Sequence, residues 1–394
     1  MRAMNPTSTT TAGPATAEAD RPGPSSPMAP PSVSRQKFIA GGGVATLATL
    51  VLPSLRPRYA FATPNDPGAG DGLVVVFLRG GADGLSIVPP FSDSGYQTLR
   101  GSGTANDVAI PAERCRPGHR AIDLGATVNG HSFGLHPALA GRKGVHDAGH
   151  LAVVHAVGMP ASESATRSPF ASEANWERGS ADPAVHGGWL ARHLQAAGAS
   201  DTLAAVAHDG SLPASLWGDH RAVAVPSIAS FDVAGFWDVD PSRRALDLLC
   251  PTADPARGFG GGLRETAQLI RADVGLRVAV VEYNGWDFHD DMGPVAGGAM
   301  RAKAQGLSDA LTAFHDDLGD LMGEVTVVVM SEFGRTIDVN GSGAADHGRG
   351  GAMMIMSGHA IGGVHGDYPS GRHGTTQEVF PGYTHPGDLG VLAV

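Results

Sequence analysis

The chain has 394 residues, of which 17% are charged, and a formal net charge of −11. This acidic balance argues against nucleic acid and anionic membranes as partners, because both repel a negative surface. Cys115 and Cys250 are the only cysteines and no Cys-x-x-Cys spacing occurs, which disfavours a thiolate metal site. In an exported protein the two thiols could form one disulfide, or they could equally stay buried and unpaired.

The first 62 residues are predicted to be a disordered stretch followed by an export signal. Residues 5–34 are rich in Pro, Ser, Thr and Ala and have no apolar period, which favours disorder. A basic flank at residues 34–38 leads into a 14-residue apolar run, 39–52, and then to the small-x-small site Ala60-Phe61-Ala62. The run is too short to span a bilayer, so this order is typical of a signal peptide, with an uncleaved anchor as the alternative.

The basic flank reads Ser34-Arg35-Gln36-Lys37-Phe38 and resembles a twin-arginine export signal in which Gln36 replaces the second arginine. Removing residues 1–62 takes away six Lys/Arg and two Asp/Glu, so the net charge moves from −11 to −15. The remaining residues, 63–394, are enough for a large core, either as one α/β domain or as one with a subsidiary lobe. We therefore expect a periplasmic, cell-wall or extracellular protein with no stable membrane span after cleavage.

The first strand is predicted over residues 73–78, which read Leu-Val-Val-Val-Phe-Leu. A continuous apolar run of this length is typical of a strand that is buried on both faces. A glycine-rich stretch follows and presents Asp83 at the carboxyl end of the strand, where α/β sheets bind ligands. The alternative is that Asp83 caps the next turn or helix.

Residues 92–134 show little periodicity and are interpreted as loops, and a broken helix is expected over 135–149. A second buried strand is predicted at 151–157, in which His155 is favoured as a core histidine rather than a ligand. The hydroxyl-rich loop 158–170 follows. A Ser or Thr at a helix start is well placed for nucleophilic attack, although most such hydroxyls only cap. The candidates are Ser164, Thr166 and Ser168.

A βαβ unit is predicted in the last third of the chain. Residues 300–321 are the clearest helix, because apolar side chains recur at steps of three and four. The apolar, β-branched runs 276–283 and 325–330 flank it and should form parallel strands of a right-handed unit. Short strands are also expected at 203–207, 222–228 and 352–356, a largely helical stretch at 240–270 and a turn at 362–366.

Carboxylate and imidazole residues follow these strands, so they should gather at one edge of the sheet. Oxygen and nitrogen ligands without sulfur suit Zn, Mn or Mg. Two such ions about 4 Å apart could clamp the attacking and leaving oxygens of a phosphate or sulfate ester. The alternative is that His289, Asp346 and His347 form a hydrogen-bonded loop scaffold. The predicted ligands are Asp83, Asp287, His289, Glu332, Asp346 and His347.

These motifs resemble an exported bacterial family known as domain of unknown function 1501. The family is similar in turn to the superfamily of alkaline phosphatase, sulfatase and cofactor-independent phosphoglycerate mutase. The resemblance implies an alkaline-phosphatase-like three-layer α/β sandwich with a mostly parallel central sheet that bears a divalent metal. The matching segments are 77–85, 285–289, 331–336, 346–348, 362–364 and 380–383.

The resemblance also assigns roles. Asp83 resembles the first metal-binding aspartate of the superfamily, and Asp287 with His289 resembles the Asp and His that precede a long helix. Two alignments of the remaining motifs are open. In the first alignment, residues 346–348 are the Asp-His-Gly of the superfamily. In the second, residues 331–334 take that place and His347 stands for a later metal-binding histidine.

The second alignment is favoured, because the Asp-His-Gly of the superfamily ends a strand that follows the long helix. It puts Phe333 where a ligating histidine is expected, which weakens or abolishes one metal site. The chain also has Ser168-Pro169-Phe170 where the family has Ser-His-Phe. Between the turn at 362–364 and the motif at 380–383 only residues 367–379 are available, fewer than the family has in this segment.

Two functions are consistent with these residues. The first is an exported metal-dependent hydrolase of phosphate or sulfate esters, in which a hydroxyl of the loop 162–168 attacks a small-molecule substrate. The alternative is a non-catalytic exported protein that keeps the fold and binds or assembles with a protein partner. Phe333 and Pro169 favour the alternative, and the retained ligand-type residues favour the hydrolase.

Overall fold

The computed structural model describes residues 72–101, 108–111, 118–158, 168–199, 203–218, 222–227, 258–366 and 368. The contacts divide the chain into two units, Met1–Pro31 and Ser32–Val394, and every described residue belongs to the second. No helix within the described ranges is long and apolar enough to cross a membrane. The predicted export signal, both cysteines, Ser164 and Thr166 lie outside the described residues.

A mostly parallel sheet of eight strands lies at the centre of the described fold. Its strands are β1 (Gly72–Leu78), β4 (Leu151–Val157), β5 (Ala205–Ala207), β6 (Ala222–Ala224), β7 (Val278–Tyr283), β8 (Val325–Met330), β9 (Gly351–Ser357) and β10 (Gly363–His365). They lie in the order β10-β4-β9-β8-β1-β7-β5-β6. Only β9 is antiparallel to its neighbours in this sheet, so the other strands end at one common edge.

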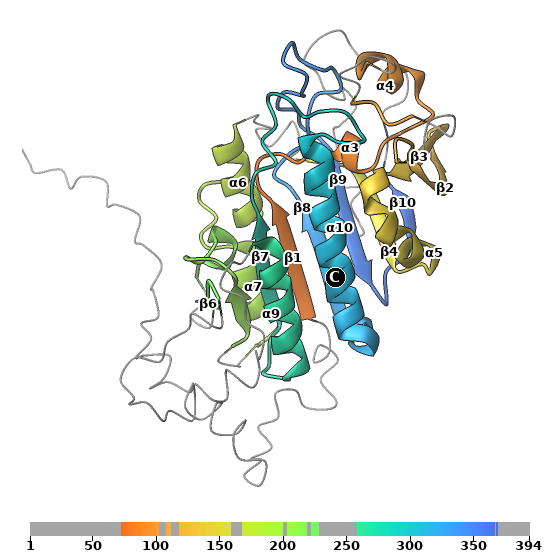
Figure 1. Cartoon of the computed structure of the whole chain (residues 1–394). Helices are drawn as coiled ribbons and strands as arrows, with labels where there is room; N and C mark the ends of the chain where they lie inside the picture. The colour runs from red at the N-terminus through yellow and green to blue at the C-terminus, as the bar shows by residue number, and fades with distance from the viewer. Residues whose placement is uncertain are drawn as a thin grey trace, which may run out of the picture. The chain divides into compact units, whose positions relative to one another are not determined.

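Helices cover both faces of the sheet (Figure 1). Alternate residues of β1 point to opposite sides, as the pleat of a strand requires. Val74 and Val76 share one core with α9 (Phe259–Arg271) and α10 (Ala299–Leu318), whereas Val75 and Phe77 share another with α7 (Trp189–Ala196). The predicted fold class, a three-layer α/β sandwich around a mostly parallel sheet, is confirmed.

The predicted βαβ unit is also confirmed. Helix α10 connects β7 to β8, and both strands pair with β1 in parallel. The apolar stripe of the helix lies against the sheet, and its buried members are Met300, Ala304, Leu307, Leu311, Phe314 and Leu318. The loops that follow β1, β7 and β8 are therefore neighbours at the carboxyl edge.

Two segments differ from the sequence prediction. Within the stretch interpreted as loops, β2 (Ile122–Val128) and β3 (His131–Leu135) form an antiparallel hairpin. Its turn is Asn129-Gly130, both with positive φ (49° and 82°), the dipeptide that two-residue hairpin turns favour. The predicted turn at 362–366 contains β10, which pairs with β4 at the edge of the sheet.

Shorter helices connect these elements: α3 (Gly84–Ile87), α4 (Ser94–Leu99), η3 (Pro137–Arg142), α5 (Lys143–Asp147), α6 (Pro169–Arg178), η5 (Ala214–Leu216) and η7 (Gly319–Glu324). His155 of β4 is buried and packs against the ring of Phe133. Burial lowers the pKa of His155 to about 3, so the ring is neutral in the folded protein. This placement agrees with the prediction of a core histidine.

Candidate metal centre

The turn after β1 lies directly against the loop after β7. The backbone N–H of Trp286 donates to the carbonyl of Arg79 at 3.1 Å. Gly80 has a φ of 116°, and a Cβ at this position would lie 2.5 Å from the backbone nitrogen of Asp287. Only glycine permits both this conformation and this approach. The glycine-rich turn thus lets the end of β1 hold the backbone that carries Asp287.

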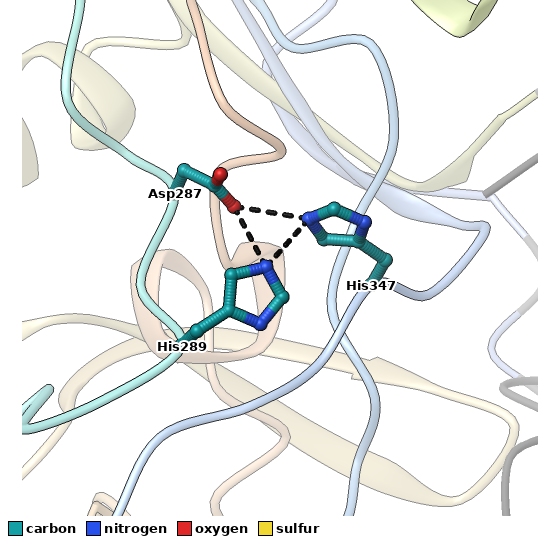
Figure 2. Close-up of side chains that lie close together, drawn as sticks. All are labelled: Asp287, His289 and His347. Atoms are coloured by element: carbon teal, nitrogen blue, oxygen red, sulfur yellow. Dashed lines mark hydrogen bonds and ion pairs between the residues drawn. The ribbon is translucent and has the colours of Figure 1, made fainter. Parts of the chain in front are cut away.

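Three ligand-type side chains converge at this edge. Oδ1 of Asp287 lies 3.1 Å from Nε2 of His289 and 3.0 Å from Nε2 of His347, and the two imidazole nitrogens are 2.8 Å apart (Figure 2). The first two residues follow β7, whereas His347 precedes β9. All three ligand atoms face one point, as a group that binds a divalent cation must. We call Asp287, His289 and His347 the Asp-His-His group.

Asp346 lies next to this group and contacts it through the second ring nitrogen of His289. Its Oδ1 is 3.1 Å from Nδ1 of His289, and it also accepts a hydrogen bond from Nδ2 of Asn340 at 3.0 Å. The same amide nitrogen donates to the carbonyl of His289 at 2.9 Å. A carboxylate at Nδ1 places the hydrogen of the neutral ring on that nitrogen, which leaves the lone pair of Nε2 directed into the group.

We therefore predict that Asp346→Ala weakens divalent metal binding by about 10- to 100-fold, the usual effect of losing a carboxylate that orients a ligating histidine. Asp346→Asn keeps an oxygen that can accept from Nδ1 and should lose less. Isothermal titration with Zn²⁺ measures both, with the exposed neighbour Asp290 replaced by alanine as the control. Equal affinity for the Asp346→Ala and Asp290→Ala variants would contradict the orienting role.

Arg335 ties together the loops that follow β1, β7 and β8. Its guanidinium is buried and donates to Oδ1 of Asp287 at 2.6 Å. The remaining acceptors are the backbone carbonyls of Gly80, Gly81, Trp286, Phe288 and Ala345. The guanidinium of Arg335 therefore fixes both the backbone around the Asp-His-His group and the side chain of Asp287.

The carboxyl of Asp287 is held in its ionised form. Burial alone would raise its pKa, but the contact with His347 and the hydrogen bond from Arg335 outweigh burial and hold the pKa below the ordinary value. An ionised carboxylate is the form that binds a metal ion. Asp287 is therefore in the protonation state that a metal ligand needs, and it shares its charge with Arg335.

Asp83 and Glu332, two of the predicted ligands, are not part of the Asp-His-His group. Asp83 is fully buried and binds the buried guanidinium of Arg100 through both carboxylate oxygens. Its Oδ1 also accepts from the N–H of Leu85 at 3.3 Å, so it caps helix α3, the alternative that the sequence left open. Glu332 is buried and accepts from the backbone N–H of Gly80 at 2.8 Å.

From the buried ion pair of Asp83 with Arg100 we predict how the stability of the fold depends on pH. Burial raises the pKa of Asp83, but Arg100 and Ser86 outweigh it and hold the pKa below the ordinary value of about 4. The unfolded chain then binds this proton more readily, so the pair stabilises the fold at neutral pH, and the contribution is lost as the pH falls below about 4. In urea titrations the free energy of unfolding of Asp83→Asn should depend less on acid pH than that of the parent chain. An unchanged dependence would contradict the pair.

The candidate nucleophile Ser168 is exposed and begins helix α6, where its carbonyl accepts from the N–H of Ser172. Gly158, the last described residue before the loop 159–167, packs against the backbone of Arg349, two residues after His347. The described end of β4 therefore lies beside the segment that carries the Asp-His-His group.

The sequence reasoning gave no role to Arg335, Arg100 or Asn340. Arg335 belongs to one of the family motifs, which was a signal that it matters. Arg100 and Asn340 lie in segments without any motif, and only the packing of the loops brings them to Asp83 and Asp346.

Ser331–Gly334 directly follows β8, and Asp346–Gly348 precedes β9. The favoured alignment of the motifs depends on this placement, because it requires the first segment to end a strand after the long helix. In this alignment Phe333 takes the place of a ligating histidine. Its ring is buried and lies 4.8 Å from the ring of His347, measured between centroids.

Comparison with solved structures gives two crystal structures of phosphonoacetate hydrolase from Sinorhizobium meliloti 1021. The complex with phosphonoformate is 13% identical, with a TM-score of 0.34, and covers 70% of this chain and 59% of that chain. The complex with phosphonoacetate is 15% identical, with a TM-score of 0.32, and covers 67% of this chain and 56% of that chain. The chain thus spans less than two thirds of the length of these hydrolases. No curated protein matches the sequence.

One family model matches part of the chain, residues 265–386. The match begins in helix α9 and includes β7, α10, β8 and β9, so it contains every member of the Asp-His-His group together with Arg335 and Asp346. Residues 265–386 match the model of the family described as protein of unknown function (DUF1501), which is the family that the motifs resemble.

Proposed function

We propose that this protein is an exported, metal-dependent hydrolase of phosphate or sulfate esters. The observation that carries the proposal is the Asp-His-His group, with its three ligand atoms within 4.8 Å of one another at the carboxyl edge of the sheet. Ligand sites of α/β proteins with open sheets lie at this edge. A group of three protein ligands, rather than four, leaves positions open for water or substrate, as catalytic metal sites do.

The donor set favours zinc or manganese over magnesium. Two imidazole nitrogens and one carboxylate oxygen suit Zn²⁺ or Mn²⁺, whereas Mg²⁺ prefers oxygen ligands alone. When bound, such an ion supplies Lewis acidity that stabilises negative charge on an ester oxygen. Arg335 holds Asp287 in place, and Asp346 orients His289. In this proposal the residues of the chain fix the geometry of the group.

We assign the nucleophile to the hydroxyl-rich loop after β4, with Ser164, Thr166 and Ser168 as candidates. Its support is the contact of Gly158 with the backbone of Arg349, which brings the start of this loop beside the segment that bears His347. Ser168 begins helix α6, where the first N–H groups of the helix favour an anionic oxygen. Substrates of this class are small-molecule esters, and export to the periplasm, cell wall or medium is part of the proposal.

The test is metal analysis and hydrolysis assays on protein purified without an affinity tag, since a histidine tag binds metal itself. We expect tightly bound zinc or manganese, turnover of an aryl phosphate or aryl sulfate, loss of turnover after chelation, and recovery when the metal is added back. Folded protein that neither binds metal nor hydrolyses either ester would contradict the proposal.

A specific observation favours the alternative of a non-catalytic binding or assembly protein. Phe333 and Pro169 stand where the related families place polar side chains, and the phenyl ring of Phe333 packs beside His347. This alternative predicts the same metal content but no ester turnover above that of free metal. The two functions therefore separate in the hydrolysis assay.

A further inference from the structure

We infer that the Asp-His-His group takes a single divalent cation, because the surroundings that a second ion would need are occupied by the guanidinium of Arg100 and the ring of Phe333. This inference rests on the proposed metal function. It extends the expectation that Phe333 weakens or abolishes one metal site, and it adds Arg100 as the group that takes Asp83 away from a second ion. Among the described residues, Asp287, His289 and His347 form the only group of His, Cys, Asp or Glu that could hold an ion through three of its members.

The first argument is the saturation of Asp83. Oδ2 accepts from Nη1 of Arg100 and from the hydroxyl of Ser86 at 2.6 Å. Oδ1 accepts from Nη2 of Arg100 at 3.0 Å and from the N–H of Leu85 at 3.3 Å. Two carboxylate oxygens have about four acceptor sites, and four donors fill them here. No lone pair of Asp83 is left for a metal ion.

The second argument is that Arg100 cannot be moved aside easily. Its side chain is fully buried and also donates to the carbonyls of Thr336 and Ile337 at 2.8 and 2.9 Å. A guanidinium keeps its charge at any physiological pH, so a metal ion that displaced it from Asp83 would leave a buried, unpaired cation. The positive charge that a second ion would bring to Asp83 is thus already supplied by an arginine.

The third argument is the ring of Phe333. It lies over the backbone of Gly81, where a Cβ would be 2.0 Å from the ring, and it packs against the imidazole of His347. A phenyl ring has no ligand atom and excludes water from the surface it covers. Glu332, the neighbouring carboxylate, accepts from the N–H of Gly80 and from the hydroxyl of Ser331. On this side of the group Phe333 therefore offers no ligand to a second ion.

The positive charge of Arg335 also disfavours a second ion. Arg335 donates to Oδ1 of Asp287, so a buried guanidinium already shares this carboxylate with the bound cation. A second dication would face the first ion and two guanidinium groups, and charges of like sign repel one another. A site with one cation can stabilise one ester oxygen, so the other oxygen depends on side chains or solvent.

The experiment is the metal stoichiometry of the full chain. We expect one Zn²⁺ per chain by mass-spectrometric metal analysis after equilibrium dialysis, with single-site binding. In Mn²⁺-loaded protein, electron paramagnetic resonance should give the hyperfine-split spectrum of an isolated ion. Two ions per chain, or the spectrum of a spin-coupled manganese pair, would overturn the inference.

Variants locate the ion. Asp287→Asn should lower the affinity for Zn²⁺ by more than about 100-fold, whereas Asp83→Asn should change neither stoichiometry nor affinity by more than about threefold. Loss of one bound ion in Asp83→Asn overturns the inference. If that variant does not fold, the stoichiometry and the manganese spectrum of the parent chain still decide. One ion without ester turnover supports the inference and contradicts the proposed hydrolase, whereas a chain that binds no ion overturns both.

Discussion

Arg335→Met is expected to destabilise the protein by about 3 to 5 kcal/mol, the usual cost of removing one partner from a buried charged network. The guanidinium is buried, and it is a donor to five backbone carbonyls as well as to Asp287. Each carbonyl left without a donor costs about 1 to 3 kcal/mol unless water reaches it, so relaxation of the loops keeps the total within that range. Asp287 is half exposed and adds little.

Urea unfolding of the metal-free protein measures this loss without contribution from a bound ion. The matched control is Arg271→Met, because Arg271 is an exposed arginine that pairs with Asp317 on the surface. Exposed ion pairs contribute roughly 0 to 1 kcal/mol, so the control should unfold close to the parent chain. If Arg335→Met and Arg271→Met were equally stable, the buried guanidinium would not hold the three loops together.

His347→Ala is expected to lower the affinity for Zn²⁺ by at least about 100-fold and to reduce ester hydrolysis to background. Zinc sites with four protein ligands bind with about 10 to 16 kcal/mol, so one ligand contributes on the order of 3 kcal/mol, which corresponds to more than a hundredfold in affinity. The imidazole of His347 contacts the rings of both Phe333 and His289, so its removal also leaves these two rings without the partner between them.

The control for His347→Ala is His315→Ala. His315 lies near the end of helix α10 and contacts Asp316 through Nδ1 at 3.3 Å, so it is also a histidine beside an aspartate. Its replacement should leave metal affinity and turnover unchanged. Titration calorimetry and the hydrolysis assay are run on both variants, with circular dichroism to verify folding. Equal affinities would place the ion elsewhere, and full turnover by folded His347→Ala would exclude catalysis at this group.

The strands and the long helix could be predicted because their signals are local. Continuous apolar runs mark β1, β4, β7 and β8, and a stripe at steps of three and four marks α10. The parallel direction followed from the helix between β7 and β8. The hairpin β2–β3 carried a local signal as well, the Asn129-Gly130 turn, which was overlooked because its strands contain few apolar residues.

The candidate site was less predictable, because side chains of the same type take different roles after folding. Asp83, Asp287 and Asp346 all lie in loops at the carboxyl edge, but their partners differ. Asp83 binds Arg100, Asp287 contacts Arg335 and two imidazole Nε2 atoms, and Asp346 contacts one imidazole Nδ1. The choice depends on loop packing and on Arg100 and Asn340, which no motif announces. Spacing along the chain can collect the ligand types at one edge but cannot assign their partners.

The reversed direction of β9 has a consequence for how the histidine loop can change. Residues 331–350 leave β8 and enter β9 at the same rim, so the loop is an arch with both feet anchored in adjacent strands. Two backbone hydrogen bonds stabilise its interior: the N–H of Thr336 donates to the carbonyl of Asp346, and the N–H of Gly348 donates to the carbonyl of Gly334, both at 2.8 Å. Outside its buried residues, among them Glu332, Phe333 and Arg335, side chains of this loop can be exchanged while its span is kept. The loop is therefore a natural place to change the ligands of the candidate metal centre without rebuilding the sheet.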